Sequence, residues 1–341
     1  LVAVAMAAAR NTNRSASAPD YQMTVDGKDI TPMVDARLIS LDLTEGRGDE
    51  ADQLTITLDD SDGKLAIPPQ GAKITLLLGW VGQALVDKGE FEVDEIEHGG
   101  TPDQLTITAR PVEMRGRIRL RDSGSWAGAT LGKVVGDIAA RNGLQPKVAP
   151  SLASRALGHI DQTNESDLHF ISRVARQHDA TATVKKGRLI VLPIGTSTTA
   201  DGQALPQLTI TRRDGDSHRW HSAERNGYTG AKASWYDQRA AKRKDVVAGD
   251  EANAKRLKDV YASEADATAA VTAERGRIER GKATFELTLA MGRPELMPQA
   301  TVTVTGFKPQ IDSARWRIVK CTHSVGDGGY TTRLEMELAA R

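Results

Sequence analysis

Hydrophobic and polar residues alternate in the first part of the chain, which is the spacing of strands that bury one face. Between residues 54 and 58, Leu54, Ile56 and Leu58 share one face and threonines occupy the other. The Asp26-Gly27 pair, set between two short apolar runs, predicts a hairpin. We expect strands at residues 21–25, 28–30, 36–43, 54–58, 73–80, 90–97 and 105–109. Short strands separated by Gly, Pro and Asp predict a small antiparallel barrel or sandwich.

The middle of the chain changes to helical spacing. Helices are expected at residues 130–142 and 164–178, a hairpin at 180–192 and a linker at 195–206. Asn142-Gly143 is a stop signal for the first helix, and Thr163 or Asn164 can cap the second. These elements predict a compact α/β module over about residues 122–194.

Strand character returns in the last part of the chain and is interrupted by one charged segment. Strands are expected at residues 208–211, 227–233, 284–291, 300–305, 316–323 and 331–338. The charged stretch at residues 239–258 is interpreted as a solvated loop. A helix is expected at residues 264–280, with Ser263 as its cap and Gly281 as its end.

The two strand-rich parts resemble each other. Matching segments are 67–76 with 296–304, Gly79-Trp80 with Gly306-Phe307, 91–98 with 316–323, and 105–108 with 334–337. Their offset stays between 225 and 229 residues. Chance similarity is the alternative, because half-buried strands often alternate threonine with aliphatic residues. The shared order and spacing favour two copies of one barrel. Three such subunits could close into a ring of six similar units.

The expected fold is therefore mainly β with α+β insertions, in which two duplicated antiparallel barrels flank a central α/β module. We divide the chain into a flexible arm (1–19), a first barrel (20–117), the central module (118–200) and a second barrel (201–341) with a helical insertion at about 239–281. This division places the inserted helix between two strands of the second copy.

Composition narrows the functional classes. Lys plus Arg and Asp plus Glu both number 45, so the formal net charge is zero, which argues against binding nucleic acid through bulk positive charge. Aromatic residues make up only 4%, which suits several thin cores better than one thick core. The single cysteine, Cys321, cannot form an intramolecular disulfide. No apolar run approaches the roughly 18 residues that a membrane span needs.

The seven histidines are candidates for catalytic or metal-binding residues. They are His98, His159, His169, His178, His218, His221 and His323. His218 and His221 could form half a metal site, but no ligand cluster with the required spacing accompanies them. His98 and His323 end equivalent strands, which favours a structural role at turns.

A few side chains are candidates for acid–base or nucleophilic catalysis. His159 with Asp161 and His169 with Asp167 are the acid–base candidates, but no Gly-x-Ser-x-Gly elbow accompanies them. Cys321 is expected in the middle of a strand, and no carboxylate pair stands out as a glycosidase site. We therefore predict no catalytic, cofactor-binding or metal site, and no cofactor.

One basic cluster hints at nucleic acid. It contains Arg239, Lys242, Arg243 and Lys244, flanked by Trp235 and Tyr236. Acidic residues follow soon afterwards at Asp245, Asp250 and Glu251, and no Gly-x-x-x-x-Gly-Lys phosphate loop is present. A solvated loop is the favoured interpretation of the cluster.

A pattern in the last part of the chain resembles a known family. It consists of residues 281–289, 294–298, 306–307, 316–319 with His323, and 329–335. The pattern resembles the phage late control D family, the hub proteins of contractile phage tails and tailocins. These are similar to the hub part of type VI secretion spike proteins. The resemblance covers about residues 20–341, and its most specific segment runs from Arg315 to Glu335.

The resemblance implies a structural role in a baseplate and no enzymatic activity. The hub would be a homotrimer that joins the hexameric tail tube to the trimeric spike as a symmetry adaptor. Its partners would be the tube protein, the spike, other baseplate proteins and, as a further candidate, the tape-measure protein, with no small-molecule substrate. It would be located in a virion or tail-like particle assembled in the bacterial cytoplasm. Because the chain ends at Arg341, soon after the second barrel, we expect a separate spike protein.

Two alternatives of other classes stay open at this point. The first is a tail-associated peptidoglycan hydrolase or cell-wall-binding protein, with residues 122–194 as the binding or catalytic module. The second is an adhesin that binds cells without being needed for assembly of the tube and spike.

Overall fold

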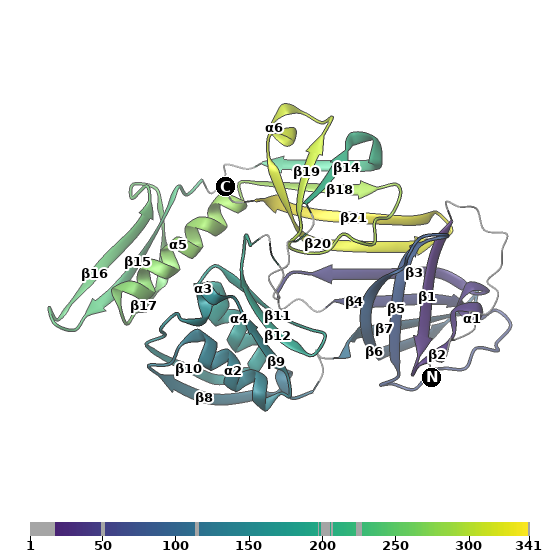
Figure 1. The fold of residues 1–341 in the computed structure, drawn as a ribbon, viewed down its shortest axis with the longest axis horizontal. Coiled ribbons are helices and arrows are strands. Elements are labelled where there is room, and N and C mark those ends of the chain that lie inside the picture. Colours follow the sequence, from purple (N-terminus) through teal and green to yellow (C-terminus); the bar gives the residue numbers. More distant parts are fainter. Residues whose placement is uncertain are drawn as a thin grey trace, which may run out of the picture.

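The computed structural model describes residues 18–48, 52–112, 116–196, 198, 205, 207–222 and 227–339. The expectation of a flexible arm at residues 1–19 lies almost entirely outside these residues. The fold is mainly β, as predicted, and its strands form two halves that lie side by side (Figure 1). A helical module lies against one side of the two halves, and a separate group of strands with one long helix projects from the second half.

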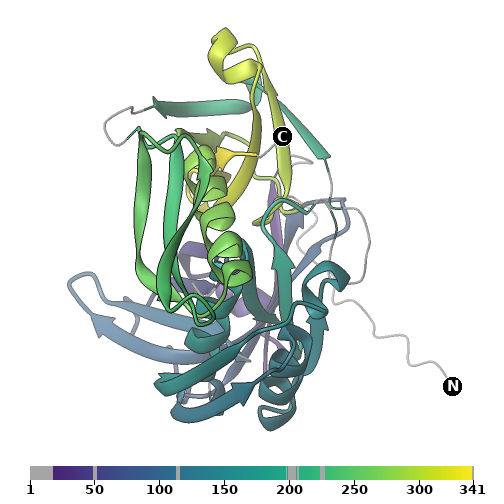
Figure 2. The ribbon, with the colours of Figure 1, turned by 90° about the vertical axis from the view of Figure 1, so that its left-hand side faces the viewer.

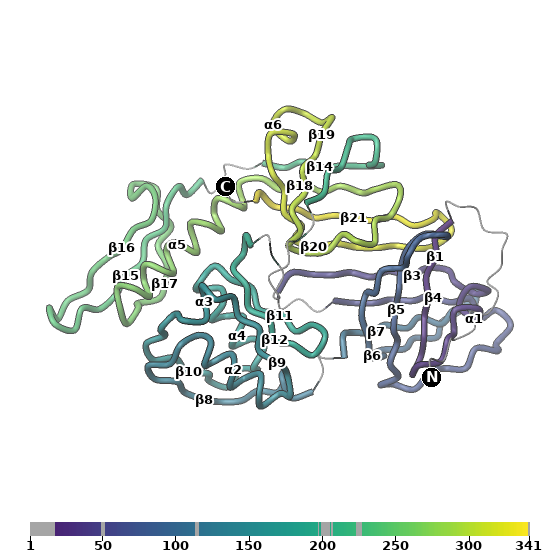
Figure 3. The backbone as a smooth tube through the Cα atoms, in the orientation of Figure 1, coloured from purple at the N-terminus to yellow at the C-terminus, as the bar shows by residue number. Residues whose placement is uncertain are grey.

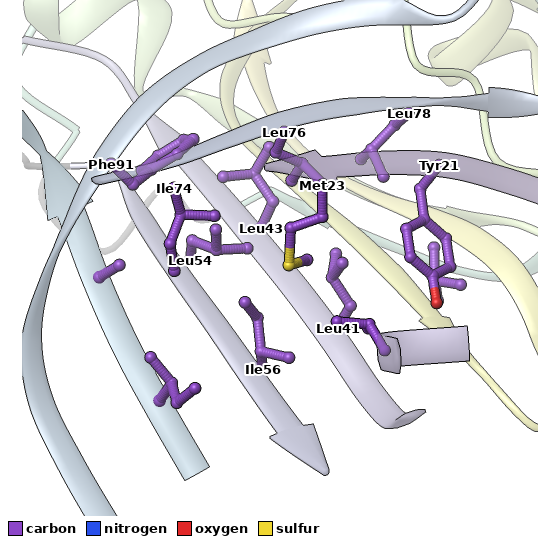
Figure 4. Packing of buried hydrophobic residues seen from close by; sticks show 14 of the residues in the cluster. Tyr21, Met23, Leu41, Leu43, Leu54, Ile56, Ile74, Leu76, Leu78 and Phe91 are labelled. Atoms are coloured by element: carbon purple, nitrogen blue, oxygen red, sulfur yellow. The ribbon is translucent and has the colours of Figure 1, made fainter. Parts of the chain in front are cut away.

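The first half is a strongly curved sheet around an aliphatic core. It comprises β1 (Pro19–Val25), β2 (Lys28–Asp29), α1 (Thr31–Asp35), β3 (Leu38–Gly46), β4 (Gln53–Asp59), β5 (Lys73–Trp80), β6 (Val86–Gly99) and β7 (Gln104–Pro111). Met23, Leu43, Leu54 and Ile74 point toward one another between the layers of this sheet (Figure 4). The alternation seen in the sequence therefore places one face of each strand in the core.

The second half repeats this arrangement. It comprises β13 (Gln207–Thr211), a 3₁₀ turn (Arg212–Asp214), β14 (Gly215–Ser222), β18 (Ala283–Leu289), β19 (Thr301–Thr305), α6 (Pro309–Asp312), β20 (Arg315–Gly326) and β21 (Gly329–Leu338). Its strand order is β14-β18-β21-β20-β19-β13, and that of the first half is β3-β4-β7-β6-β5-β1. The two orders correspond strand by strand, but β1 is antiparallel to β5 whereas β13 is parallel to β19. The predicted duplication is therefore a duplication of topology for the five strands from β3 to β7 and their equivalents β14, β18, β19, β20 and β21.

Local irregularities recur at equivalent places in the two halves. The β6–β7 register shifts between Val93 and Glu95, and the β20–β21 register shifts between Ile318 and Lys320, 225 residues later. The amide of Gly71 donates to the Val93 carbonyl at 3.0 Å, and the amide of Gln299 donates to the Ile318 carbonyl at 2.9 Å. Both donors have positive φ, which is unusual for a glutamine. Shared bulges of this kind are typical of a common backbone design.

The match between the sequences of β7 and β21 is shifted by two residues relative to their match in the structure. Ile96 lies opposite Ile107, and Cys321 lies opposite Leu334, so Ile107 is the structural equivalent of Leu334. The sequence comparison had matched Leu105 with Leu334 instead. A slip of two residues keeps every side chain on the same face, which is why the hydrophobic pattern could not reveal it.

The expected closed barrels are wrong, because the two halves share one open sheet. Strand β3 pairs with β20 of the second half and does not close onto its own half. The result is one 13-stranded sheet that runs from β14 to β2, with β13 and β19 as a side branch at β20. The edge of one half is thus covered by the other half of the same chain.

The central module contains the two predicted helices and the predicted hairpin, together with three strands and a short helix that were not predicted. Its elements are a 3₁₀ turn (Arg117–Arg119), β8 (Arg121–Ala127), α2 (Leu131–Arg141), β9 (Gln145–Val148), α3 (Pro150–Ala153), β10 (His159–Ser166), α4 (Asp167–Gln177), β11 (Ala180–Lys185) and β12 (Arg188–Pro193). The cap of α4 is Ser166, whose hydroxyl accepts from the His169 amide at 3.3 Å, and not Thr163 or Asn164. Those two residues instead continue β10, which pairs with β8.

The insertion in the second half contains strands that the sequence did not predict. The stretch expected as a solvated loop forms β16 (Lys242–Gly249) and β17 (Ala254–Tyr261), which flank β15 (Gly230–Asp237). Helix α5 (Glu264–Arg280) has the predicted bounds, with Ser263 and Gly281 as its caps. Figures 2 and 3 show this sheet and α5 packed together away from the main sheet. The division of the whole chain at residues 117 and 200 remains our proposal.

Candidate functional site: the seam between the two halves

The seam is the place where β3 of the first half pairs with β20 of the second half. The antiparallel register runs from Lys320 opposite Gly46 to Gly326 opposite Ser40. On one face of the seam, the hydroxyls of Thr44 and Thr322 lie 3.3 Å apart. On that same face the Ser324 hydroxyl donates to an Asp42 carboxylate oxygen at 2.6 Å. The other face of the seam is buried and holds most of the charge described below.

A buried ion pair of the first half lies at the seam on its inner face. The Glu45 carboxylate and the Lys88 ammonium are 2.5 Å apart, and both side chains are only 3% exposed. Lys88 also donates to the Pro294 carbonyl of the second half at 3.0 Å. Lys185, at the tip of the central module's hairpin, donates to the other Glu45 oxygen at 3.1 Å. The Nε2 of His323, from the second half, lies 3.5 Å from Glu45 Oε2, so one carboxylate contacts groups from both halves and from the central module.

The charges around Glu45 stabilise its ionised form. Burial alone would raise the pKa of Glu45, but its hydrogen bond with His323 and the charges of Lys88 and Lys185 hold it well below its usual range. Burial likewise would lower the pKa of Lys185, and the carboxylates of Glu45 and Asp52 outweigh that effect and raise it. Both shifts favour the charged forms of Glu45 and Lys185, which is the condition for tolerating a buried carboxylate.

His323 lies at the centre of the same buried cluster. Its Nδ1 is 3.0 Å from the Thr332 hydroxyl and 2.9 Å from the Tyr330 hydroxyl, and its Nε2 is 3.3 Å from the Cys321 sulfur. Burial lowers the pKa of His323 and raises the pKa of the Cys321 thiol. A protonated, fully buried thiol is a poor nucleophile. The Cys–His pair is therefore a packing contact of the seam.

We predict that acidification weakens the protein through His323. Because the pKa of the folded state lies below that of the unfolded state, the unfolded chain binds an extra proton as pH falls through about 6.5. Between pH 7.5 and 5.5, His323 then lowers the unfolding free energy by at most about 1.4 kcal/mol, the value for a histidine that stays neutral in the folded state. Urea titrations at the two pH values measure this difference.

The control for this prediction is His323→Gln. This variant keeps hydrogen-bonding capacity and loses the titrating group, so its pH-dependent loss should be smaller by the same amount. His178, whose pKa is also lowered by burial, accounts for part of what remains. An unchanged pH dependence in the variant would contradict the assignment to His323.

A second group of charges lies at the end of the seam, where β3 ends and β20 begins. Glu337 of β21 pairs with Arg47, and it lies 3.5 Å from Arg280 at the end of α5. Arg280 also binds Asp179 of the central module through two hydrogen bonds of 2.8 and 2.5 Å. Arg317 donates to the Gly195 carbonyl at 3.3 Å. All four parts of the fold therefore meet in ionic contacts around one seam.

The two histidines of the equivalent pair have different surroundings. His98 lies near the end of β6, half-exposed, with its Nε2 3.1 Å from an Asp60 oxygen. Its equivalent, His323, lies within β20 and is fully buried, so a turn role is wrong for it. The duplication thus preserves the position of this histidine but not its surroundings.

The candidate pairs for acid–base chemistry do not form a site. His159 and Asp161 lie 3.1 Å apart, but both are more than half exposed. His169 contacts Glu165 at 2.8 Å, while Asp167 is buried and accepts hydrogen bonds from Arg141, Gln162 and Asn142. The predicted pairing of His169 with Asp167 is therefore wrong, because Asp167 lies in the interior of the module.

His218 and His221 lie on β14. Three residues apart on a strand, they point to opposite faces and cannot bind one ion together. Within the described residues there is no group of three or more His, Cys, Asp or Glu side chains that could hold a metal. The described part of the chain also contains no helix that is long and apolar enough to cross a membrane.

One member of the basic cluster at residues 239–244 is held in local contacts. Lys244 pairs with Asp237 at 2.6 Å, and its ammonium lies 5.5 Å from the centre of the Trp235 ring. Lys242 and Arg243 are exposed residues of β16. A strand-bound, partly neutralised cluster adds no support for nucleic-acid binding.

Sequence reasoning missed the ionic residues of the seam. Leu41, Leu43 and Glu45 follow one another at every second position of β3 and are all buried. Glu45 stands at a position where the alternation predicts a buried apolar residue. This was the signal available in the sequence, because a charge at a buried position requires a partner. The sequence offered no means of naming Lys88 and Lys185 as those partners, because they lie 43 and 140 residues away.

Comparison with known proteins identifies the family of this fold. Residues 37–329 match the family model described as phage tail baseplate hub (GPD). The chain is 42% identical to the probable baseplate hub protein of Escherichia phage 186, over 94% of this chain and 93% of that protein. This chain belongs to the phage tail baseplate hub family. It is a structural component of a phage tail baseplate, as the resemblance had implied.

Solved structures with low sequence identity share the fold of this baseplate hub protein. The 43 kDa tail protein of prophage MuSo2 from Shewanella oneidensis is 17% identical and has a TM-score of 0.68, covering 93% of this chain and 98% of that one. The E. coli c3393 protein, a component of the type VI secretion system, is 13% identical with a TM-score of 0.57, covering 94% and 77%. The fold is thus shared between phage tails and a type VI secretion component.

Proposed function

We propose that this baseplate hub protein acts as a homotrimer that joins a hexameric tail tube to a trimeric spike. The observation that supports this most strongly is the duplicated strand order within one continuous sheet. Three chains with two equivalent halves present six similar units to the tube and three identical units to the spike. A single protein can therefore match both symmetries without a change in its own fold.

The ionic seam supports a mechanical role in this assembly. Glu45 contacts groups from both halves and from the central module. The ladder of backbone pairs between β3 and β20, which is buried on one face, restricts movement of one half relative to the other. A ring that passes force from tube to spike requires halves that do not rotate against each other. Tube protein, spike and neighbouring baseplate proteins are the partners that this role requires.

We predict that the purified protein is trimeric, alone or together with its spike protein. Multi-angle light scattering should give three times the chain mass of 36.7 kDa for the hub component. The edges of the sheet supply the pairing surface that drives this association. A stable monomer under both conditions would contradict the trimer.

We also infer that the hub works without a chemical step of its own. The buried Cys321 thiol is protonated and the His159–Asp161 pair is more than half exposed to solvent, which supports this inference. A turbidity assay on purified cell wall tests the hydrolase alternative. Clearing that depends on Asp161 would overturn the inference and favour an enzyme.

A further inference from the structure

A cavity lined by arginines lies where the first half, the central module and the helix of the insertion meet. Its volume is about 220 Å³. The first half contributes a residue that directly follows β3, and the two other parts contribute residues of α4 and of the last turn of α5. These polar lining residues are Arg47, Ser172, Arg176, Arg277 and Arg280. We call this space the arginine cavity.

Two buried donors in the wall of the arginine cavity have no hydrogen-bond partner among the described residues. Ser172 is 5% exposed, and its hydroxyl is one of them. The Arg280 side chain is 3% exposed, and its Nε is the other, although a Glu337 oxygen lies 3.5 Å away. Because buried donors are rarely left without an acceptor, a ligand that carries acceptor oxygens would complete this wall.

Positive charge exceeds negative charge on the buried side of the cavity. Glu337 pairs with Arg47 and lies 3.5 Å from Arg280. It also faces Arg317 across the β20–β21 ladder. Burial lowers the pKa of Arg317, and the charges of the other two arginines lower it further against the opposing charge of Glu337. The second carboxylate here, Asp179, accepts hydrogen bonds from Arg280 with both oxygens, so three guanidinium groups share two carboxylates.

The rim of the cavity also carries more cations than described carboxylates. Arg277 pairs with Glu274, but Glu274 also binds Lys255 at 2.6 Å, so two cations share one carboxylate. Arg277 donates in addition to the Arg176 carbonyl at 3.4 Å. Helix C-termini attract cations, which accounts for arginines at the ends of α4 and α5. It does not account for the unpartnered Ser172 hydroxyl inside the cavity.

We propose that the arginine cavity binds one small tetrahedral oxyanion of the size and charge of inorganic phosphate. Guanidinium groups present several N–H donors in a fixed plane that matches the oxygens of such an anion. The Ser172 hydroxyl supplies a neutral donor from the buried wall. A volume of about 220 Å³ equals that of roughly seven water molecules, which suits a free phosphate ion and leaves little room for a sugar and base.

A bound anion would join three parts of the same chain. It would contact Arg47 of the first half, α4 of the central module and the end of α5, whose sheet projects from the main sheet. A ligand that binds only the folded arrangement stabilises it. Phosphate would therefore fix the insertion against the central module. The site lies within one chain, so its occupation does not depend on the trimer.

Isothermal titration calorimetry of the full-length protein with sodium phosphate tests the site. The protein is kept in a phosphate-free buffer, and sodium chloride of equal ionic strength is the control titrant. We expect saturable binding of one phosphate per chain and no saturable binding of chloride. AMP carries a phosphate group on a bulky sugar and base, and it should bind at least about tenfold more weakly than free phosphate.

Two variants remove donors that come from different parts of the fold. Ser172→Ala and Arg277→Gln should each raise the Kd for phosphate about tenfold, because each loses a hydrogen bond to a charged group. Ser172→Ala should not lower the melting temperature in phosphate-free buffer, since its hydroxyl has no partner among the described residues. The matched control Arg275→Gln removes an exposed arginine of α5 that does not line the cavity, and its Kd should stay within about twofold.

A further variant tests whether carboxylates of the chain itself compete for the site. Asp49 and Glu50 follow the lining residue Gly48 in the sequence and lie outside the described residues. The variant Asp49→Asn/Glu50→Gln should keep the Kd for phosphate within about threefold of the original value. Phosphate affinity that rises about tenfold or more would assign the cavity to these carboxylates and overturn the proposal.

The other outcomes that would overturn the site are equally distinct. Heat that does not saturate with phosphate, or an unchanged Kd in both Ser172→Ala and Arg277→Gln, would show that water alone fills the cavity. Equal losses for Arg277→Gln and Arg275→Gln would show a general effect of charge. AMP binding as tight as that of phosphate would overturn the assignment to a small free anion.

Discussion

Replacing Lys88 by methionine should lower the free energy of unfolding by about 3–5 kcal/mol, because it leaves a buried carboxylate without its main partner. Glu45 and Lys88 are each 3% exposed, and the remaining cation near Glu45, Lys185, is 41% exposed. The change also removes the hydrogen bond from Lys88 to the Pro294 carbonyl. Urea denaturation followed by circular dichroism measures the loss.

The matched control is Lys73→Met. Lys73 pairs with Glu90 at 3.4 Å, but about half of each side chain is exposed, so its loss should cost at most about 1 kcal/mol. The double variant Glu45→Leu/Lys88→Met removes both charges and should recover a large part of the stability lost in Lys88→Met. Equal losses for Lys88→Met and Lys73→Met would show that the seam ion pair does not lock the halves.

Trp316→Ala should destabilise the second half by about 3–5 kcal/mol through the cavity that it leaves. Trp316 is fully buried, its ring centre lies 5.2 Å from that of Phe285, and its indole donates to the Ile311 carbonyl at 3.0 Å. The equivalent residue of the first half is Phe91, which is also buried. The midpoint of urea unfolding checks the loss.

Two controls accompany this substitution. Trp316→Phe reproduces the residue of the first half, keeps most of the buried ring and loses the hydrogen bond, so we expect a loss of about 1–2 kcal/mol. Tyr236→Ala removes an exposed aromatic and should change stability by about 0.5 kcal/mol or less. A loss for Trp316→Ala no larger than that for Tyr236→Ala would contradict the core role of this residue.

Elements with local signals could be predicted closely from the sequence. Helix α5 begins after Ser263 and ends before Gly281, as the caps indicated. Strand β5 has the predicted bounds, and the hairpin of β11 and β12 turns at Lys186 and Gly187, which have positive φ. These features depend on a few neighbouring residues, and their signals are therefore complete within a short window.

Elements that depend on distant partners could not be predicted in the same way. The strands β16 and β17 are rich in charge, and they are strands because β15 pairs with both and α5 covers them. The cap of α4 was misplaced because pairing with β8 extends β10 as far as Ser166. Tertiary pairing outweighed local composition in both cases.

The sequence by itself determined the duplication, the mainly β class and the family resemblance, since order, spacing and alternation are properties of the chain. Only the tertiary structure decided that the halves form one open sheet, with β3 paired to β20. It also decided that Glu45, Lys88, Lys185 and His323 meet in one buried cluster. Strand edges and buried charges are satisfied by groups far away in sequence, and the identity of those groups is set only when the chain folds.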